Sequence, residues 1–410
     1  MRSLKIIVTM WIVYASFYLC RVNYSVALPY INSETGITFT SLGVIASGFF
    51  ILYSIGQVLN GYLGVKYNPW IIIFIGIVGS SISTILFGLS NHFTFFLILW
   101  LINGYFQSTG WPSLVKIISF TLSSREMGKG YGIVNTSWAL GHVISWLFTG
   151  ILATYYGWRF GFIINGFIFL LIGMIPAVYL FRFTGDLVIV GTTGKGFPKH
   201  KELDGLFSLK WSVATISILS LVYSIEYAVR YALIIYLPSY LYNVEQASMS
   251  SIFTMIIFPF SGSLGMLFFG WLFDKLSIYG KTLLMVLLIP IIAFSLNSFP
   301  VYYEHVKIAG TLLLAILSFI LYGLESQIVS TIPVTIIGRK YSSLATGIIN
   351  SAGSLGAFVS SIVSGIIIDS QGFHSMFGFW SYMQLIQLTL ILVFLATVRK
   401  GYSERPKIEG

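Results

Sequence analysis

Two stretches of this chain carry the same pattern of aromatic, charged and proline residues: YASFYLCRVNYSVALP at residues 14–29 and YSIEYAVRYALIIYLP at residues 223–238. A shift of 209 positions places two tyrosines, one arginine and a Leu-Pro pair of the first stretch on identical residue types in the second. Leu and Ile identities arise easily by chance in an apolar chain, whereas ungapped Arg, Tyr and Pro identities do not. The two stretches therefore indicate an internal duplication.

The duplication continues beyond these two stretches. The same shift pairs Ser54 with Ser263, Gly56 with Gly265, Gly61 with Gly270, Leu63 with Leu272 and Lys66 with Lys275. A shift of 215 positions pairs Gly132-Ile133 with Gly347-Ile348, Asn135 with Asn350, Leu140-Gly141 with Leu355-Gly356 and Gly150-Ile151 with Gly365-Ile366. Several segments of the first part of the chain thus have a counterpart in the second.

The composition places the chain in a membrane. Of its 410 residues 56% are apolar and only 9% are charged, with a mean hydropathy of +0.88, whereas a soluble domain carries about 25% charged residues. This excludes a soluble enzyme, a disordered chain and a nucleic-acid-binding domain. A run such as residues 71–79 shows no alternation of apolar and polar residues, which argues against a membrane β-barrel.

The chain contains twelve stretches of the length and hydrophobicity that a membrane-spanning helix needs, about 20 residues. They lie near 6–28, 41–63, 70–90, 94–120, 129–155, 159–182, 211–237, 250–273, 282–299, 307–336, 343–368 and 374–398. We therefore predict an all-α integral membrane protein with twelve transmembrane helices. The first stretch carries Arg21 and lacks a small-residue cleavage site, so we interpret it as a retained helix rather than a signal peptide.

The basic residues predict an orientation. If both termini are cytoplasmic, most of the 23 Lys and Arg residues fall on cytoplasmic loops and tails, only Arg159 and Lys307 fall on the other side, and Arg21, Lys116 and Arg230 lie within spans. This distribution follows the positive-inside rule. We expect a multi-pass protein of the plasma membrane with both ends in the cytoplasm, and we attribute most of its net charge of +10 to topology.

A polar linker divides the spans into two sets of six. Residues 184–210 form the longest polar stretch and contain five glycines among mixed charges. We therefore predict an N-terminal six-helix half at 1–183, a cytoplasmic linker at 184–210 and a C-terminal six-helix half at 211–410, related by a pseudo-twofold axis. Transporters built from such parallel repeats bind substrate near the bilayer midplane between the repeats.

Two arginines within the spans are the main candidates for a binding site. A buried Arg at a helix centre costs about 2.5–3.5 kcal/mol on insertion scales, so such residues usually face a cavity or a partner. Helical spacing puts Tyr14 and Tyr18 on the face of Arg21, and Tyr223 and Tyr227 on the face of Arg230. Guanidinium groups bind phosphate or carboxylate through two parallel hydrogen bonds. We expect an anion site around both arginines; the alternative is that each arginine snorkels or pairs with a structural acid.

Two acids within the spans allow more than one role. Glu226 lies four residues before Arg230, a spacing that favours an ion pair, and Glu325 lies in the tenth span. Because a buried carboxyl group can hold a proton near neutral pH, either acid could carry a proton that couples transport. Glu226 could equally neutralise Arg230 until substrate displaces it.

Other polar residues within spans are candidates for lining a cavity. Trp138 and His142 lie one turn apart in the fifth span, and Asn103 and Gln107 share a face of the fourth. We add these four to the predicted substrate-binding residues, although a lone His can also be a packing residue. The chain has no HExxH, GxSxG or metal-spaced cluster and no complete phosphate loop. We therefore predict no enzymatic activity, no catalytic residues, no metal or cofactor and no nucleic-acid partner.

Several motifs together carry a family resemblance. They are Tyr18-Leu19-Cys20-Arg21-Val22-Asn23 followed by Ala27-Leu28-Pro29-Tyr30, Asn103-Gly104-x-x-Gln107-x-x-Gly110-Trp111-Pro112, Arg230-Tyr231 with Leu237-Pro238-x-Tyr240-Leu241, Tyr322-Gly323, and Gly347 to Gly356. They resemble the organophosphate:phosphate antiporters of the major facilitator superfamily, which include glycerol-3-phosphate and hexose-phosphate transporters. The resemblance implies a major facilitator fold, a monomer, phosphate binding by Arg21 and Arg230, and exchange of an organic phosphate for inorganic phosphate by alternating access.

The chain also departs from that family. It has Gln57 and Trp138 where the family commonly has Lys and His, and Glu226 and Glu325 stand at apolar positions. These changes make the site less positive than in a typical phosphate exchanger. Arg-Val-Asn followed by Ser-Val-Ala-Leu-Pro also resembles the anion:cation symporter family, so a proton-coupled organic-anion symporter is one alternative. A non-transporting sensor on the same fold is another.

Overall fold

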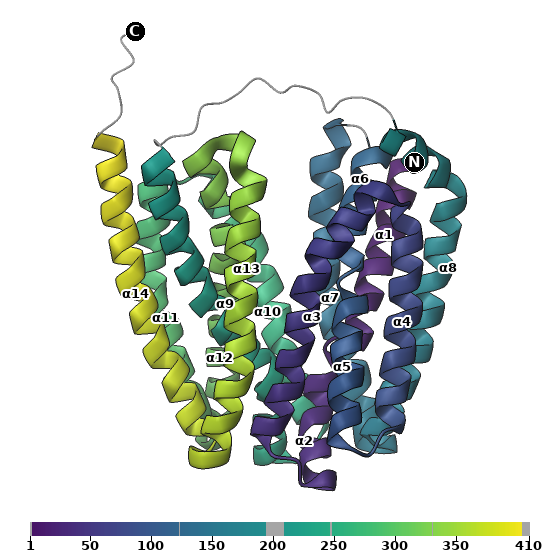
Figure 1. The fold of residues 1–410 in the computed structure, drawn as a ribbon. Helices are drawn as coiled ribbons and strands as arrows, with labels where there is room; N and C mark the ends of the chain where they lie inside the picture. The colour runs from purple at the N-terminus through teal and green to yellow at the C-terminus, as the bar shows by residue number, and fades with distance from the viewer. Residues whose placement is uncertain (1, 123, 194–208, 247, 330, 404–410) are drawn as a thin grey trace. The chain divides into compact units, whose positions relative to one another are not determined.

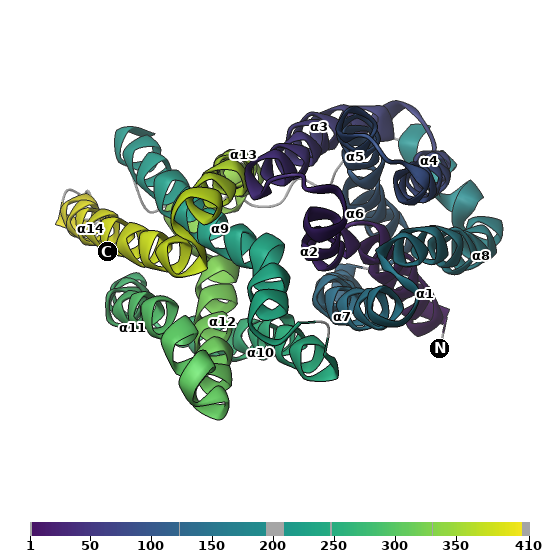
Figure 2. The same ribbon diagram turned by 90° about the horizontal axis from the view of Figure 1, so that it is seen from below.

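The computed structural model of the chain describes residues 2–122, 124–193, 209–246, 248–329 and 331–403. In these ranges the regular elements are helices (Figures 1 and 2). They are α1 (Arg2–Phe17), η1 (Tyr18–Cys20), α2 (Asn23–Thr35), α3 (Phe39–Lys66), α4 (Pro69–Leu89), α5 (Phe93–Gln107), α6 (Gly110–Thr121), α7 (Ser124–Tyr156), α8 (Trp158–Thr193), α9 (Leu209–Glu245), α10 (Met249–Asp274), α11 (Ile278–His305), α12 (Lys307–Val329), α13 (Thr331–Gln371) and α14 (Phe373–Ser403).

Eleven segments of the described chain are long and apolar enough to cross a membrane. The predicted span at 94–120 differs, because it consists of α5 and α6 separated at Ser108 and Thr109. Pro112 has no N–H to bond with the carbonyl of Ser108, and its ring crowds that carbonyl, so a continuous helix is disfavoured there. With α5 and α6 counted as one span, the described residues contain the twelve predicted spans, and the all-α membrane fold is confirmed.

The chain forms two compact units. One unit contains residues 1–197 and 234–260, and the other contains residues 198–233 and 261–410. The predicted linker, 184–210, begins inside α8 and ends inside α9, and residues 194–208 lie outside the described residues. The division at 1–183 and 211–410 stays a prediction about the repeat.

Residues 234–260 contact the rest of the first unit through aromatic side chains. The hydroxyl of Tyr236 in α9 donates to the carbonyl of Phe39 at 3.2 Å. The rings of Tyr242 and Tyr30 lie 4.9 Å apart. A Cβ atom added at Gly150 in α7 would lie 3.0 Å from the side chain of Met255 and 3.1 Å from that of Ile252, both in α10, so the glycine permits close packing of the two helices. These contacts explain why this part of α9 and α10 packs with α2, α3 and α7.

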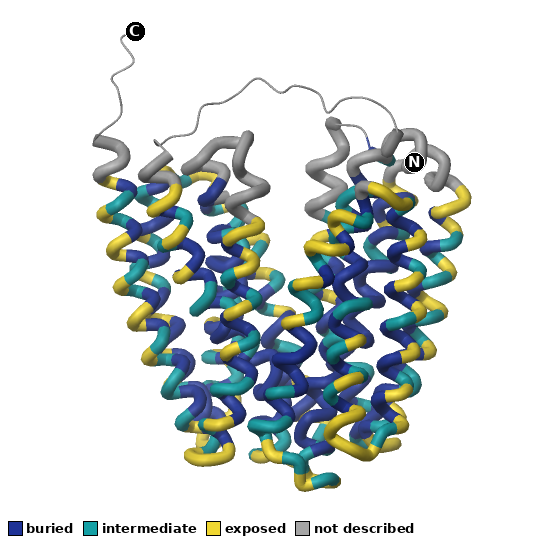
Figure 3. Tube along the Cα trace, in the orientation of Figure 1, coloured by how far each residue is buried: buried dark blue, intermediate teal, exposed yellow. Residues whose placement is uncertain are grey.

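The first span lies in the interior of its unit. Of the segments that can span a membrane, Leu4–Thr35 has the largest buried share and Phe373–Arg399 the smallest. Figure 3 shows the difference as long runs of buried positions on the former and recurring exposed positions along α14. Buried polar side chains of this span, such as Asn23 and Ser25, therefore face other protein groups rather than lipid.

The two units repeat one close helix contact at equivalent positions. A Cβ atom on Gly141 in α7 would lie 2.7 Å from the carbonyl oxygen of Ala15 in α1, and a Cβ on Gly356 in α13 would overlap the carbonyl oxygen of Ser224 in α9. Both glycines and both carbonyl residues are paired by the shifts found in the sequence. The repeat thus extends to the packing of the helices.

Gly356→Ala is expected to lower the Tm of the purified protein, because the added methyl group overlaps the Ser224 carbonyl. Gly347→Ala is the matched control, since it lies on the same helix and no atom lies within 4 Å of the position that its added methyl group would take. Alanine stabilises a helix by about 0.5–1 kcal/mol relative to glycine, so the control should keep or raise the Tm. Equal changes in Tm for the two variants would contradict the close contact.

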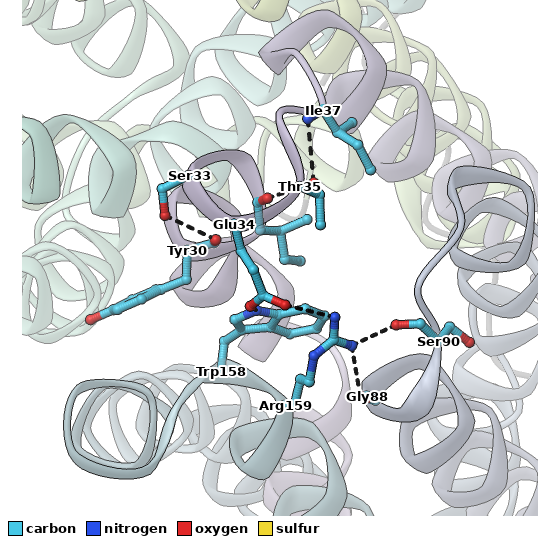
Figure 4. Close-up of polar contacts among 10 residues, drawn as sticks. Tyr30, Ser33, Glu34, Thr35, Ile37, Gly88, Ser90, Trp158 and Arg159 are labelled. Atoms are coloured by element: carbon cyan, nitrogen blue, oxygen red, sulfur yellow. Dashed lines mark hydrogen bonds and ion pairs between the residues drawn. The ribbon is translucent and has the colours of Figure 1, made fainter.

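A cluster of polar contacts closes one end of the first unit (Figure 4). Arg159 at the start of α8 pairs with Glu34 at 2.8 Å and also donates to the carbonyl oxygens of Ser90, at 2.5 Å, and Gly88, at 3.3 Å. The indole N–H of Trp158 donates to Glu34 at 2.6 Å. The guanidinium group therefore binds carbonyl oxygens that the last turn of α4 cannot satisfy within the helix.

Arg159→Ala is expected to lower the Tm more than Glu34→Gln. The arginine variant leaves the carbonyl oxygens at the end of α4 without this donor, while the glutamine variant mainly removes an exposed ion pair worth about 0–1 kcal/mol. Thermal unfolding of both variants in the same detergent measures the difference. A larger loss for Glu34→Gln would show that the ion pair, and not the carbonyl contacts, holds this end together.

Candidate anion-binding site

Arg21 follows an interruption in the first span. α1 ends at Phe17, three residues form the 3-10 turn η1, and α2 begins at Asn23. Two amide side chains of α5 bind backbone carbonyls at the interruption: Nε2 of Gln107 donates to Phe17 at 3.0 Å, and Nδ2 of Asn103 donates to Cys20 at 2.8 Å. Carbonyl groups that a continuous helix would satisfy are thus bound from α5.

Neutral groups orient the guanidinium group of Arg21. Its Nε donates to Oε1 of Gln107 at 3.0 Å, one terminal nitrogen donates to the Gln107 carbonyl at 3.3 Å, and the other donates to the Tyr18 hydroxyl at 3.3 Å. The rings of Tyr18 and Tyr53 each lie 4.8 Å from its central carbon. These contacts position the half-buried arginine and do not cancel its charge.

Asn103 and Gln107 have a more specific place than the sequence indicated. Ser80 in α4 donates to Oδ1 of Asn103 at 2.6 Å, and Gln107 donates to Ser80 at 2.8 Å. Both amide side chains are fully buried. Asn103 lies behind the interruption of the first span, and Gln107 contacts Arg21 directly. Ser80 was not predicted; its signal in the sequence is the Ser80-Ser81 pair inside an apolar span.

Aromatic side chains extend the Arg21 cluster. Tyr14 is buried, with its ring 5.9 Å from Tyr18 and 5.2 Å from Trp111. His142 is buried in α7, with its ring 6.4 Å from Tyr18 and 4.5 Å from Trp146. Trp138 is half-buried one turn before His142. The structure therefore brings Tyr14, Tyr18 and His142 into the Arg21 cluster, and it adds Tyr53 and Trp111.

Arg230 lies in the second unit and pairs with Glu325. Nε of Arg230 in α9 lies 2.8 Å from Oε2 of Glu325 in α12, and both side chains are about nine-tenths buried. The N–H of this nitrogen is not directed at the oxygen, so the contact is an ion pair without a linear hydrogen bond. Three rings surround the guanidinium carbon, those of Tyr227 at 4.5 Å, Tyr231 at 4.9 Å and Tyr322 at 5.2 Å.

The ion pair between Glu226 and Arg230 that their spacing favours does not form in this structure. Although the two residues have the right spacing, Arg230 pairs across helices with Glu325, while Oε2 of Glu226 accepts a hydrogen bond from Nε2 of Gln387 at 2.6 Å. Packing of α12 and α14 against α9 supplies these partners, which the sequence of α9 alone does not contain.

Tyr223 connects the ion pair to α13. Its hydroxyl lies 3.4 Å from Oε1 of Glu325 and 3.3 Å from Oδ1 of Asn350. Gly353 in α13 lies against the rings of Tyr223 and Tyr227. Both predicted tyrosines therefore belong to the Arg230 cluster, and Asn350 is a further member that the 215-residue shift had already paired with Asn135.

Each cluster is suited to binding an anion. In both, an arginine lies within aromatic rings, which stabilise a guanidinium group through cation–π contacts. The N–H donors of a guanidinium group match the oxygens of a phosphate or carboxylate. The hydrogen bonds of Arg21 described above are to neutral groups, whereas Arg230 pairs with the carboxylate of Glu325. In the part of the chain that the structure describes, no group of three or more His, Cys, Asp or Glu side chains is placed to hold a metal ion.

Comparison with known proteins agrees with this architecture. The profile of the Major Facilitator Superfamily matches residues 10–360. A protein of Chlamydia trachomatis named "Probable hexose phosphate transport protein" is 27% identical over 96% of this chain and 90% of its own length. The "Membrane sensor protein UhpC" of Escherichia coli is 27% identical over 66% of this chain and 64% of its own length.

A solved structure shares the fold. The inward-facing, unoccupied structure of a bacterial homologue of the human lysosomal transporter Spinster has a TM-score of 0.75, with 16% identity over 99% of both chains. This similarity concerns the fold alone. The superfamily consists of transporters rather than enzymes, and its profile matches most of the sequence. The chain belongs to the Major Facilitator Superfamily.

Proposed function

We propose that this chain is a secondary transporter of a small organic anion, and that it exchanges an organic phosphate for inorganic phosphate by alternating access. The observation that carries the proposal is the arginine found at equivalent positions of the repeat, each enclosed by tyrosine rings on its own helix face. The similarity to the hexose phosphate transport protein of C. trachomatis supports a phosphorylated substrate. We place the protein in the plasma membrane with both termini cytoplasmic.

In this proposal Arg21 and Arg230 both bind the anion. A guanidinium group forms two parallel hydrogen bonds with a phosphate, each strengthened by charge. The hydrogen bonds from Arg21 to Gln107 and Tyr18 hold its guanidinium group in position for this contact. When an anion binds, it replaces Glu325 as the partner of Arg230. A neutral ligand could not compete with the carboxylate for the guanidinium group, so the ion pair selects for anions.

The other predicted residues are assigned supporting roles. Tyr14, Tyr18, Tyr223 and Tyr227 provide hydroxyl donors and aromatic surface, while Asn103, Gln107, Trp138 and His142 shape the Arg21 side of the site. Among these, Gln107 is the residue through which the arginine position is fixed, because its side-chain oxygen and its carbonyl both accept from Arg21.

Two alternatives have specific support. The buried acids Glu226 and Glu325 favour a proton-coupled organic-anion symporter, because such transporters use carboxyl groups as proton carriers. The similarity to the membrane sensor protein of E. coli favours a sensor that binds the anion without moving it.

Counterflow in proteoliposomes separates the three functions. Purified protein is reconstituted with inorganic phosphate, a hexose phosphate, a dicarboxylate or no anion inside, and labelled phosphate is added outside with and without a pH gradient. The antiporter requires labelled phosphate to enter only when a phosphate compound is present inside. Uptake that is driven by the pH gradient into empty vesicles would replace it with the symporter, and saturable binding without uptake would replace it with the sensor.

A further inference from the structure

A second buried polar cluster lies beside the Arg230 ion pair. Glu226 in α9 and Gln384 and Gln387 in α14 are each no more than 1% exposed. Nε2 of Gln387 donates to one carboxyl oxygen of Glu226 at 2.6 Å. Within the described residues, the other carboxyl oxygen, the amide oxygen of Gln387 and both amide atoms of Gln384 are buried without a hydrogen-bond partner. A natural core rarely leaves so many polar atoms in one place unsatisfied.

The burial of Glu226 disfavours its ionised form. The charged groups that act on it are Arg230 on its own helix and Glu325 on α12, and these two neutralise each other in an ion pair. The side chains of α14 that face it, among those the structure describes, are the neutral amides of Gln384 and Gln387. A carboxylate buried without its own counter-ion costs several kcal/mol, whereas a carboxylic acid can be buried with ordinary hydrogen bonds.

We propose that Glu226, Gln384 and Gln387 form a proton-binding site distinct from the Arg230–Glu325 pair. This inference rests on the proposed transport function. In the proposed state Glu226 is a neutral carboxylic acid: Gln387 donates to one of its oxygens, and its O–H donates to the side-chain oxygen of Gln384, which has no other partner among the described residues. When water reaches the site, the proton passes to water and a carboxylate remains.

Release of the proton alters anion binding through Arg230. The carboxylate of Glu226 would lie one helical turn from Arg230, at a spacing that permits an ion pair. It would then compete with the transported anion for the guanidinium group. Binding of a proton at Glu226 and of an anion at Arg230 therefore favour each other, and each must raise the affinity for the other by the same factor. Glu325 has the separate role of a counter-ion.

Infrared spectroscopy tests the protonation directly, without a transport assay. The purified protein at neutral pH is expected to show a carboxylic-acid C=O band that shifts in D2O, disappears in Glu226→Gln and persists in Glu325→Gln. Gln387→Leu should keep the band and move it to higher frequency, because the hydrogen bond to the carbonyl oxygen is lost. An unchanged band in Glu226→Gln would overturn the proposal, and Gln387→Leu provides the second reading if Glu226→Gln does not fold.

The pH dependence of counterflow tests the coupling. Wild-type phosphate counterflow should fall about tenfold for each pH unit above the value at which Glu226 loses its proton, and Glu226→Gln should remove this dependence while Gln371→Glu, at the end of α13, keeps it. The same pH dependence in wild type and Glu226→Gln would overturn the coupling.

A requirement for Na⁺ that Glu226→Gln removes would assign the cluster to Na⁺ instead. Absence of any counterflow in wild type would overturn the proposed function, and the infrared result would still stand.

Discussion

Arg230→Lys is expected to reduce anion counterflow to less than about one hundredth of the wild-type rate while the protein still folds. Lysine keeps a positive charge for Glu325, so the buried pair survives. It cannot form two parallel hydrogen bonds with a phosphate or lie flat against the rings of Tyr227 and Tyr231. Each charge-assisted hydrogen bond contributes about 1.5–3 kcal/mol, and about 1.4 kcal/mol corresponds to a tenfold change.

The same result is expected for Arg21→Lys. A single ammonium group cannot contact both the side chain and the carbonyl of Gln107 in the way that the guanidinium group does. The matched controls are Arg182→Lys and Arg399→Lys, which change exposed arginines at the ends of spans. Counterflow is compared at equal amounts of protein that elutes as a single species in detergent. Wild-type rates in either site variant would remove that arginine from the anion site.

Glu325→Gln is expected to tighten anion binding at least about tenfold and, in the absence of anion, to lower the Tm. Removing one partner of a buried ion pair costs about 3–5 kcal/mol, because the remaining charge is uncompensated. In this variant Arg230 meets an incoming phosphate without competition from a carboxylate. Saturating phosphate should therefore raise the Tm of the variant more than that of the wild type.

Phosphate binding by isothermal titration and thermal unfolding with and without phosphate measure both effects. Glu304→Gln is the control, because it removes an exposed acid at the end of α11 that is not part of the Arg230 cluster. A lower Tm with unchanged phosphate affinity would mean that Glu325 supports the fold of the second unit without competing with the transported anion.

Much of the fold could be predicted from the sequence, because the length of an apolar stretch and the residues that recur at a fixed shift can be read directly along the chain. The helix face shared by Arg230, Tyr223 and Tyr227 followed from spacing along α9 alone. The interruption at Ser108 was also readable in principle, since Pro112 lies four residues later. Residues 94–120 are apolar on both sides of this break, so hydropathy alone does not reveal it.

The partners of the charged residues could not be predicted in the same way. Spacing suggested that Glu226 would pair with Arg230. Side chains four positions apart compete, however, with polar groups that neighbouring helices supply. Here α12 brings Glu325 to Arg230, and α14 brings Gln387 to Glu226. Such choices depend on how helices pack, and no single segment contains that information.

The position of Gln107 gives the first span a mechanical property. One end of its amide holds the carbonyl of Phe17 at the interrupted backbone, and the other end holds Arg21. An anion that drew the guanidinium group toward itself would weaken the hydrogen bonds from Arg21 to Gln107 and, through Gln107, the support of the Phe17 carbonyl at the joint between α1 and α2. Binding of the anion and bending of the first span at this joint would then occur together.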